Sequence, residues 1–219
     1  MCFSAPASFL AAGVTGIIGI GCLTKVRRAR ELPLAAMPLL FSAQQLAEGL
    51  LWLTLPVAPD AAQASLLTFI FLVYAKVFWP IYVPVASALV EPDARRRAIM
   101  WAIGAGGAAI GAYFLQRIWH ADHMASILGG HIVYEGPADL PLAVGVIYFL
   151  ATCLAPLLSS YRAVRVLALI VLAGAVITYA FYWQAFTSVW CFFAAAASIV
   201  LYHHFAREMA QPAAIRARS

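Results

Sequence analysis

Residues Ala62–Val90 read AQASLLTFIFLVYAKVFWPIYVPVASALV, and this stretch decides the fold class. It carries a single charged residue, Lys76, and the chain then continues as EPDARRR with Arg95, Arg96 and Arg97. An α-helix needs roughly 20 apolar residues to cross the ~30 Å hydrocarbon core of a bilayer. The stretch therefore predicts a transmembrane helix that ends at a basic loop.

Six further segments have the same character. They are Ser8–Leu23, Pro33–Leu55, Ala98–Ile118, Leu140–Leu158, Val164–Trp183 and Ala185–Phe205. The whole chain is 64% hydrophobic and 11% charged, so these segments could not be exposed to water in a soluble protein. We predict an all-α integral membrane fold, a bundle of seven transmembrane helices. Residues 1–205 form its single domain, and residues 206–219 form a short polar tail.

The basic residues predict the orientation of this bundle. Twelve of the 14 Lys and Arg residues follow the first, third, fifth and seventh segments. They are Lys25, Arg27, Arg28, Arg30, Arg95, Arg96, Arg97, Arg162, Arg165, Arg207, Arg216 and Arg218. Because short loops rich in Lys and Arg stay in the cytoplasm, we expect the N-terminus outside and the C-terminus in the cytoplasm.

The net charge of +5 has the same explanation. The basic clusters lie where anionic lipid headgroups attract them, so the expected partners are membrane lipids and not nucleic acid. The expected location is the plasma membrane, which is the inner membrane of a bacterium.

Polar residues inside the second and third segments are the first candidate site. Gln44 and Glu48 are four residues apart on one helix face, with Gln45 beside them. Lys76 lies midway along the third segment. Since intramembrane charges usually face the bundle interior and pair, we predict a Glu48–Lys76 ion pair, with Gln44, Gln45 and Tyr74 as hydrogen-bond partners. Either the pair only fixes the helix register, or it belongs to a binding or proton-handling site.

The outer loop after the fourth segment is the second candidate site. His120, Asp122, His123 and His131 offer nitrogen and oxygen ligands for a zinc-like metal ion. The alternative is a solvated polar loop with interfacial histidines.

Cys191 is predicted to face the outer part of the bundle, on a stripe with Gln184 and Ser188. Cys2 lies on the same side of the membrane, so a ligand site with both cysteines, or a disulfide between them, stays open. Nucleophile-elbow, zinc-protease and nucleotide-binding motifs do not occur in the sequence.

Glycines and prolines predict how the helices pack. Gly107 and Gly111 have G-x-x-x-G spacing, which allows close helix approach, and the first segment carries Gly13, Gly16 and Gly19. Pro80 and Pro84 are expected to bend the third segment and to free backbone carbonyls.

Three stretches carry a resemblance to a known family. They are MCFSAPASF at 1–9, ELPLAAMPLLF at 31–41 and QQLAEGLLW at 44–52. With them the chain resembles an uncharacterised family of bacterial multi-pass membrane proteins that begin with MCFSA. The resemblance implies architecture rather than activity, and it draws attention to Cys2, Phe3, Ser4, Gln44, Gln45 and Glu48. In helix number the chain is also similar to membrane hydrolases of the alkaline-ceramidase type, but it lacks their paired His on the last helix at the shared membrane face.

The sequence is compatible with three functions. The leading hypothesis is a membrane protein with an outward-facing polar pocket for a small ligand, lipid or ion, which serves transport or sensing. This pocket is built from the second, third and seventh segments and capped by the loop 120–139. The alternatives are a membrane-embedded metal-dependent hydrolase-like enzyme that uses the outer His/Asp loop, and an accessory subunit that binds a membrane-protein partner.

Overall fold

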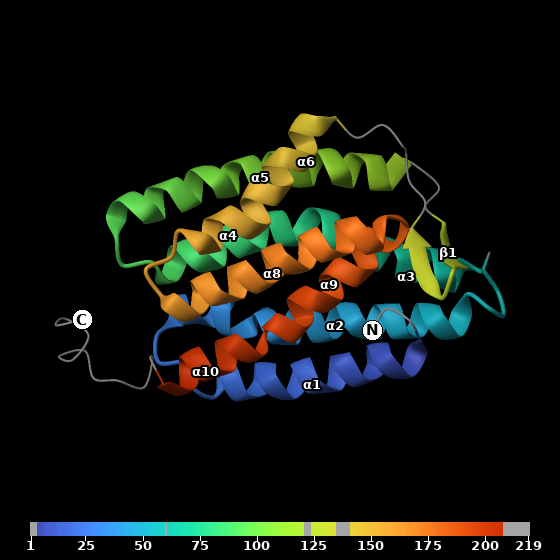
Figure 1. Ribbon diagram of the computed structural model, residues 1–219, viewed down its shortest axis with the longest axis horizontal. Helices are drawn as coiled ribbons and strands as arrows, with labels where there is room; N and C mark the ends of the chain where they lie inside the picture. Colours follow the sequence, from blue (N-terminus) through green and yellow to red (C-terminus); the bar gives the residue numbers. More distant parts are fainter. Residues whose placement is uncertain (1–3, 60, 121–123, 135–140, 208–219) are drawn as a thin grey trace.

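The computed structural model describes residues 4–59, 61–120, 124–134 and 141–207, and in these residues the chain is mostly helical (Figure 1). Seven helical stretches follow the order of the predicted segments. They are α1 (Ala5–Leu23), α2 (Leu32–Thr54), α3–η2–α4 (Ala62–Leu72, Val73–Phe78, Trp79–Val90), α5 (Ala94–His120), α6–η3–α7 (Leu142–Phe149, Leu150–Leu154, Ala155–Leu157), α8 (Arg162–Phe181) and α9–α10 (Phe186–Ala197, Ile199–Arg207). Short 3₁₀ turns precede α2 and α9, η1 at Ala29–Glu31 and η4 at Trp183–Ala185.

Five of these stretches are long and apolar enough to cross a membrane. They are Ala5–Leu23, Ala62–Val90, Ala94–His120, Arg162–Phe181 and Phe186–Arg207. The α6–α7 stretch, Leu142–Leu157, is apolar but shorter. The α2 helix has 23 residues but carries the polar run that includes Gln44, Gln45 and Glu48. The all-α prediction is confirmed, and the protein has the character of a membrane protein.

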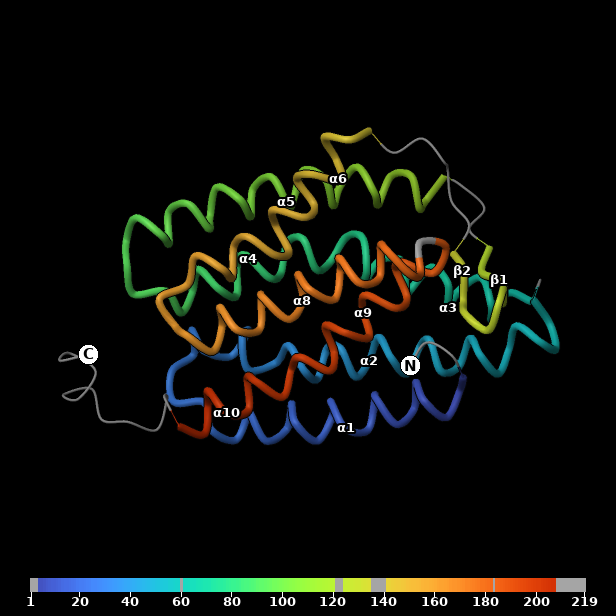
Figure 2. The backbone as a smooth tube through the Cα atoms, viewed as in Figure 1, coloured from blue at the N-terminus to red at the C-terminus, as the bar shows by residue number. Residues whose placement is uncertain are grey.

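The basic loops gather at one end of the bundle (Figure 2). Lys25 lies over the ring of Tyr202, 5.6 Å from its centroid, so the α1–α2 loop meets α10. Arg96 donates to the carbonyl of Leu158 at 3.3 Å, so the start of α5 meets the α7–α8 loop. The described residues of the four predicted clusters thus share one end, which we call the basic end of the bundle (Figure 2); Arg216 and Arg218 lie outside the described residues.

Glycine allows α5 to pack closely on α4. A Cβ at Gly107 would lie 1.9 Å from the carbonyl oxygen of Pro80, and one at Gly111 would lie 3.1 Å from that of Val77. The predicted G-x-x-x-G pair therefore lies in a packing seam. In α1, Gly19 is similarly close to Leu39, but Gly13 has open space beside it.

Two stretches of π-helix, η2 and η3, interrupt the third and fifth helices. Each ends two residues before a proline. The amide of Trp79 bonds to the carbonyl of Tyr74, so the next π-type bond would join the carbonyl of Ala75 to Pro80, which has no N–H. The Tyr148 hydroxyl donates to the Ala75 carbonyl instead. Pro156 follows η3 in the same way. The freed carbonyl expected from Pro80 is thus satisfied by a neighbouring helix.

The connection between α5 and α6 contains a β-hairpin that the sequence did not predict. Strand β1 (Ala125–Leu128) pairs antiparallel with β2 (His131–Tyr134), with Leu128 opposite His131. Gly129 and Gly130 form the two-residue turn with φ of 58° and 78°, as a type I′ turn requires. Because Ala125 and Ile132 are buried against α2 and α3, the hairpin covers the end of the bundle opposite the basic end (Figure 1).

Candidate functional site

A buried polar cluster joins α2, α4 and α9 near the middle of the bundle. Trp79 donates its indole N–H to Oε1 of Gln44 at 2.7 Å, and Nε2 of Gln44 donates to Sγ of Cys191 at 3.1 Å. The ring of Phe41 stacks on Trp79 at 3.9 Å between centroids. Gln44 is 0% exposed, so both ends of its amide are matched inside the protein.

Glu48 lies one helical turn further along α2, and it is also 0% exposed. Its carboxylate accepts hydrogen bonds from Ser188 of α9, from Tyr134 of β2 at 3.4 Å and from Gln45 at 3.5 Å. In the described residues every one of these partners is neutral, and no ion pair reaches this carboxylate. The second and seventh helices and the β-hairpin therefore meet at one buried acid.

Gln45 adds a second acceptor to this cluster. Its side chain is 0% exposed, and its Oε1 is buried without a hydrogen-bond partner while its Nε2 faces Glu48. A buried acceptor that lacks a donor costs about 1–3 kcal/mol. The cluster thus offers an unmatched amide oxygen and an acid with only neutral partners, a combination that suits a ligand carrying hydrogen-bond donors.

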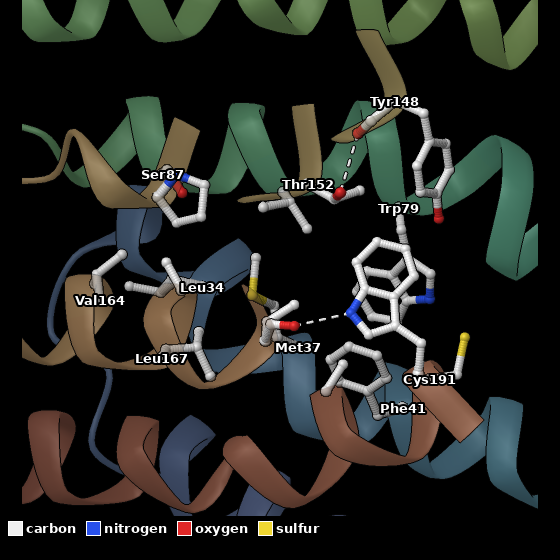
Figure 3. Close-up of a pocket in the computed structure, with 16 residues that line it drawn as sticks. Leu34, Met37, Phe41, Trp79, Ser87, Tyr148, Thr152, Val164, Leu167 and Cys191 are labelled. Carbon is white, nitrogen blue, oxygen red and sulfur yellow. Dashed lines mark hydrogen bonds between the residues drawn. The ribbon is translucent and has the colours of Figure 1, made fainter. Parts of the chain in front are cut away.

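A cavity of about 60 Å³ lies next to the cluster, toward the basic end (Figure 3). Its lining is mostly aliphatic and aromatic, and Trp79, Tyr148 and Cys191 lie together at the end that touches the cluster (Figure 3). Ser87 lines the cavity with a buried hydroxyl that has no partner. An apolar cavity of ~150 Å³ binds benzene, so this one as it stands holds a group of a few heavy atoms.

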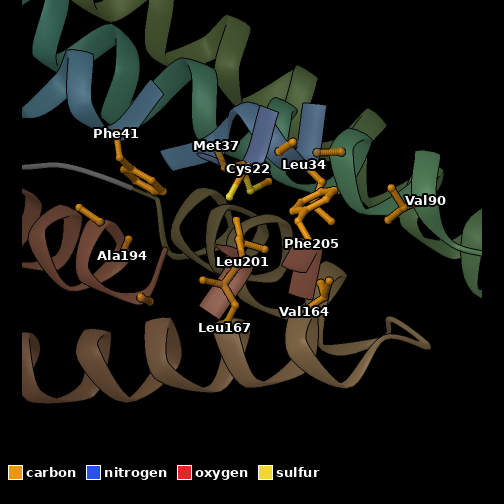
Figure 4. Close-up of a cluster of buried hydrophobic side chains, with 14 of the residues drawn as sticks. Cys22, Leu34, Met37, Phe41, Val90, Val164, Leu167, Ala194, Leu201 and Phe205 are labelled. Carbon is orange, nitrogen blue, oxygen red and sulfur yellow. The ribbon is translucent and has the colours of Figure 1, made fainter. Parts of the chain in front are cut away.

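The apolar core beyond the cavity closes the basic end (Figure 4). Leu34 and Met37 of α2 pack there with Val164 of α8 and with Leu201 and Phe205 of α10. All five side chains are at most 3% exposed. The polar cluster lies between this core and the hairpin, whose Tyr134 bonds to Glu48.

Lys76 does not pair with Glu48 in the structure. Its Nζ lies over the ring of Phe114 of α5 at 5.9 Å, and the charge of Arg117 acts on it. Residue counting predicted a similar depth in the membrane for both residues. The structure shows that their side chains do not face each other. Ala75 packs toward α2, while the next residue turns toward α5. Tyr74 contacts Phe78 at 5.4 Å and is likewise not a partner of Glu48 in the described structure.

The structure describes two of the four predicted metal ligands, His120 and His131. His120 is exposed at the end of α5, and His131 of β2 contacts the ring of Tyr182 at 5.3 Å. Asp122 and His123 lie outside the described residues, as does Cys2. Within the described residues no group of three His, Cys, Asp or Glu side chains could hold a metal ion. The zinc-like site stays a prediction.

Cys191 has a free thiol in the structure, as do the buried Cys22 and Cys153. Sequence reasoning missed two residues of the cluster, Trp79 and Tyr134. Trp79 lies four residues before Val83 on the cavity-lining face of α4, a pattern that also fits an ordinary buried aromatic. Tyr134 could be assigned only by recognising the Gly129-Gly130 turn that starts β2.

Comparison with known proteins gives a family but no activity. The sequence model of a family of unknown function, DUF6629, matches residues 1–217. This agrees with the resemblance to an uncharacterised family. No curated protein matches the chain. No solved structure matches it either.

Proposed function

Since the chain belongs to DUF6629, a family of unknown function, we propose a function from the site itself: binding of a small ligand inside a membrane-embedded bundle, for transport or sensing. The ligand places hydrogen-bond donors against Glu48 and Gln45. Its apolar part extends past Gln44 into the cavity beside Trp79 and Cys191.

The observation that carries this proposal is the buried carboxylate of Glu48, which has neutral partners only among the described residues. A buried charge whose hydrogen-bond partners are all neutral is expensive in a bilayer interior. A ligand with an ammonium or hydroxyl group would compensate it and would also satisfy Oε1 of Gln45. Ligand sites commonly combine an apolar lining with a few polar groups of this kind.

Access from the outside belongs to the same proposal. Tyr134 of β2 donates to Glu48, and its ring stacks on Phe71 at 4.5 Å, so the hairpin acts as the cap. We infer that the cap moves when the ligand enters. We also assign Cys2 to this site, because the sequence predicts that it lies on the same side of the membrane.

The site favours this function over the accessory-subunit alternative. A charge that locks onto a lateral partner has to face outward from the bundle, whereas Glu48 is 0% exposed. The enzyme alternative depends on the zinc-like loop site, and none of the described contacts supports it.

The test uses thermal unfolding of the full chain in neutral detergent with three matched probes: ethylammonium, ethanol and acetate. We expect ethylammonium to raise the unfolding temperature most and acetate to leave it unchanged. A ligand at ten times its Kd stabilises by about 1.4 kcal/mol. Trp79 donates to Gln44 beside the site, so its fluorescence should shift with the same concentration dependence.

Two variants make this test specific. Glu48→Gln keeps the shape of the side chain but should abolish the ethylammonium response. Glu31→Gln is the control, because Glu31 is also buried but its carboxylate accepts from the backbone amides of Arg27 and Arg28 at the basic end. If wild type and Glu48→Gln respond alike to all three probes, the proposal is wrong.

A further inference from the structure

Lys76 and Arg117 are the two basic residues that belong to none of the four clusters at the basic end. Both lie within candidate membrane spans, Ala62–Val90 and Ala94–His120. Both are half-buried. Their position away from the basic end requires a separate explanation, because intramembrane charges are costly and usually mark a site.

The fold brings these two cations to neighbouring aromatic rings of α5. Nζ of Lys76 lies 5.9 Å from the ring centroid of Phe114, and Cζ of Arg117 lies 5.5 Å from that of Tyr113. The two rings are themselves in edge contact at 5.7 Å. Gly111 allows this approach, since a Cβ there would lie 3.1 Å from the carbonyl oxygen of Val77.

The described carboxylates do not neutralise this pair. Each is engaged elsewhere: Glu31 with backbone amides of Arg27 and Arg28, Glu48 with Ser188, Glu91 with Ser160, and Asp93 with the amide of Arg96. The Lys76 ammonium makes no hydrogen bond to any residue that the structure describes. Arg117 makes one, from Nη1 to the Tyr113 hydroxyl at 3.0 Å.

Most N–H donors of Lys76 and Arg117 therefore have no acceptor among the described residues. An ammonium has three N–H donors and a guanidinium has five. Two like charges over adjacent rings repel each other where water is scarce. An oxyanion between them would remove the repulsion and accept several of these hydrogen bonds, with the Arg fork suited to two oxygens of a phosphate.

We propose that Lys76 and Arg117 form an oxyanion site for a phosphate group, separate from the Glu48 site. The π-helix η2 that carries Lys76 supports a functional role, because single π-turns inside helices are frequent at functional sites. Arg117 lies one turn from the end of α5, the level at which a phospholipid headgroup or a dissolved phosphate could reach it.

Two arms of one experiment distinguish these sources. The chain is purified in neutral detergent and examined by native mass spectrometry after addition of phosphatidylglycerol or phosphatidylcholine. Inorganic phosphate is tested separately by thermal unfolding. Retention of phosphatidylglycerol alone assigns the site to a lipid headgroup, and stabilisation by phosphate alone assigns it to a free anion. If neither binds, the proposal is overturned.

The variants test the residues. Loss of one charged hydrogen-bond donor should weaken binding about tenfold. We expect this for Lys76→Met and for Arg117→Gln, with Arg117→Lys weakened less. Arg162→Gln at the exposed start of α8 is the matched control and should bind as wild type. Wild-type binding by the Lys76→Met/Arg117→Gln double variant would overturn the proposal.

Stability in the absence of the anion separates this role from a structural one. If the pair awaits an anion, Lys76→Met removes repulsion and its unfolding temperature in neutral detergent equals or exceeds that of wild type. A clear fall in that temperature would instead show that Lys76 supports the fold by itself, and would count against the proposal.

Discussion

Glu91 ties the end of α4 to the loop before α8. Its side chain is 1% exposed and accepts from the Ser160 backbone N–H at 2.7 Å, from the Ser160 hydroxyl and from the Asp93 N–H at 3.2 Å. Glu91→Ala would leave these donors unmatched, so we expect it to lower the free energy of unfolding by about 1–3 kcal/mol. Denaturant unfolding measures this. Asp93→Ala, which removes a bond to an exposed amide, should cost less, and an equal cost would contradict the assignment.

Single residues also show where sequence reasoning reached its limit. Gln44, Gln45 and Glu48 could be assigned to one buried cluster because the polar run lies on one helix face in an apolar segment. The partner of Glu48 could not be assigned. Depth along a helix follows from residue counting, but the face that Lys76 presents depends on the π-turn of η2 and on packing against α5.

Close packing of α5 on α4 depends on one glycine. A Cβ at Gly107 would lie 1.9 Å from the Pro80 carbonyl oxygen, so Gly107→Ala must push the two helices apart. We expect a loss of about 1–3 kcal/mol or more, as for other overpacked sites. Thermal unfolding in detergent measures it. Gly13→Ala adds the same methyl group where nothing lies within 4 Å and should be tolerated. Similar behaviour of the two variants would show that the seam is not tight.

At the level of elements, the sequence predicted the helices well and the irregular parts poorly. Long apolar runs mark each helix, and the boundaries of α3–α4 at Ala62 and Val90 agree with the prediction. The π-turns could not be foreseen, since proline indicates a disturbed helix but not which carbonyl a distant tyrosine will satisfy. The hairpin was missed because β1 and β2 have only four residues each.

For the molecule as a whole, hydropathy and charge predicted more than pairwise contacts. The basic loops gather at one end because the seven helices alternate in direction, which follows from short connections between long helices (Figure 1). The internal cavity could not be predicted, because it depends on how α8 stands off from α2 and α4 while α7 and α9 flank it.

The orientation of the molecule in the membrane gives the last prediction. The basic end carries Lys25, Arg96 and Arg165, and the positive-inside rule places that end in the cytoplasm. The hairpin turn at Gly129 and Gly130 is exposed, and a Cβ added at either glycine would meet nothing within 4 Å among the described residues beyond its chain neighbours, so the turn should accept an inserted epitope. We expect antibody to reach this epitope in intact cells (spheroplasts if an outer membrane is present). An epitope after Ser219 should be reached only after permeabilisation. A hairpin epitope that is protected until permeabilisation would reverse the orientation and place the Glu48 cluster at the cytoplasmic side.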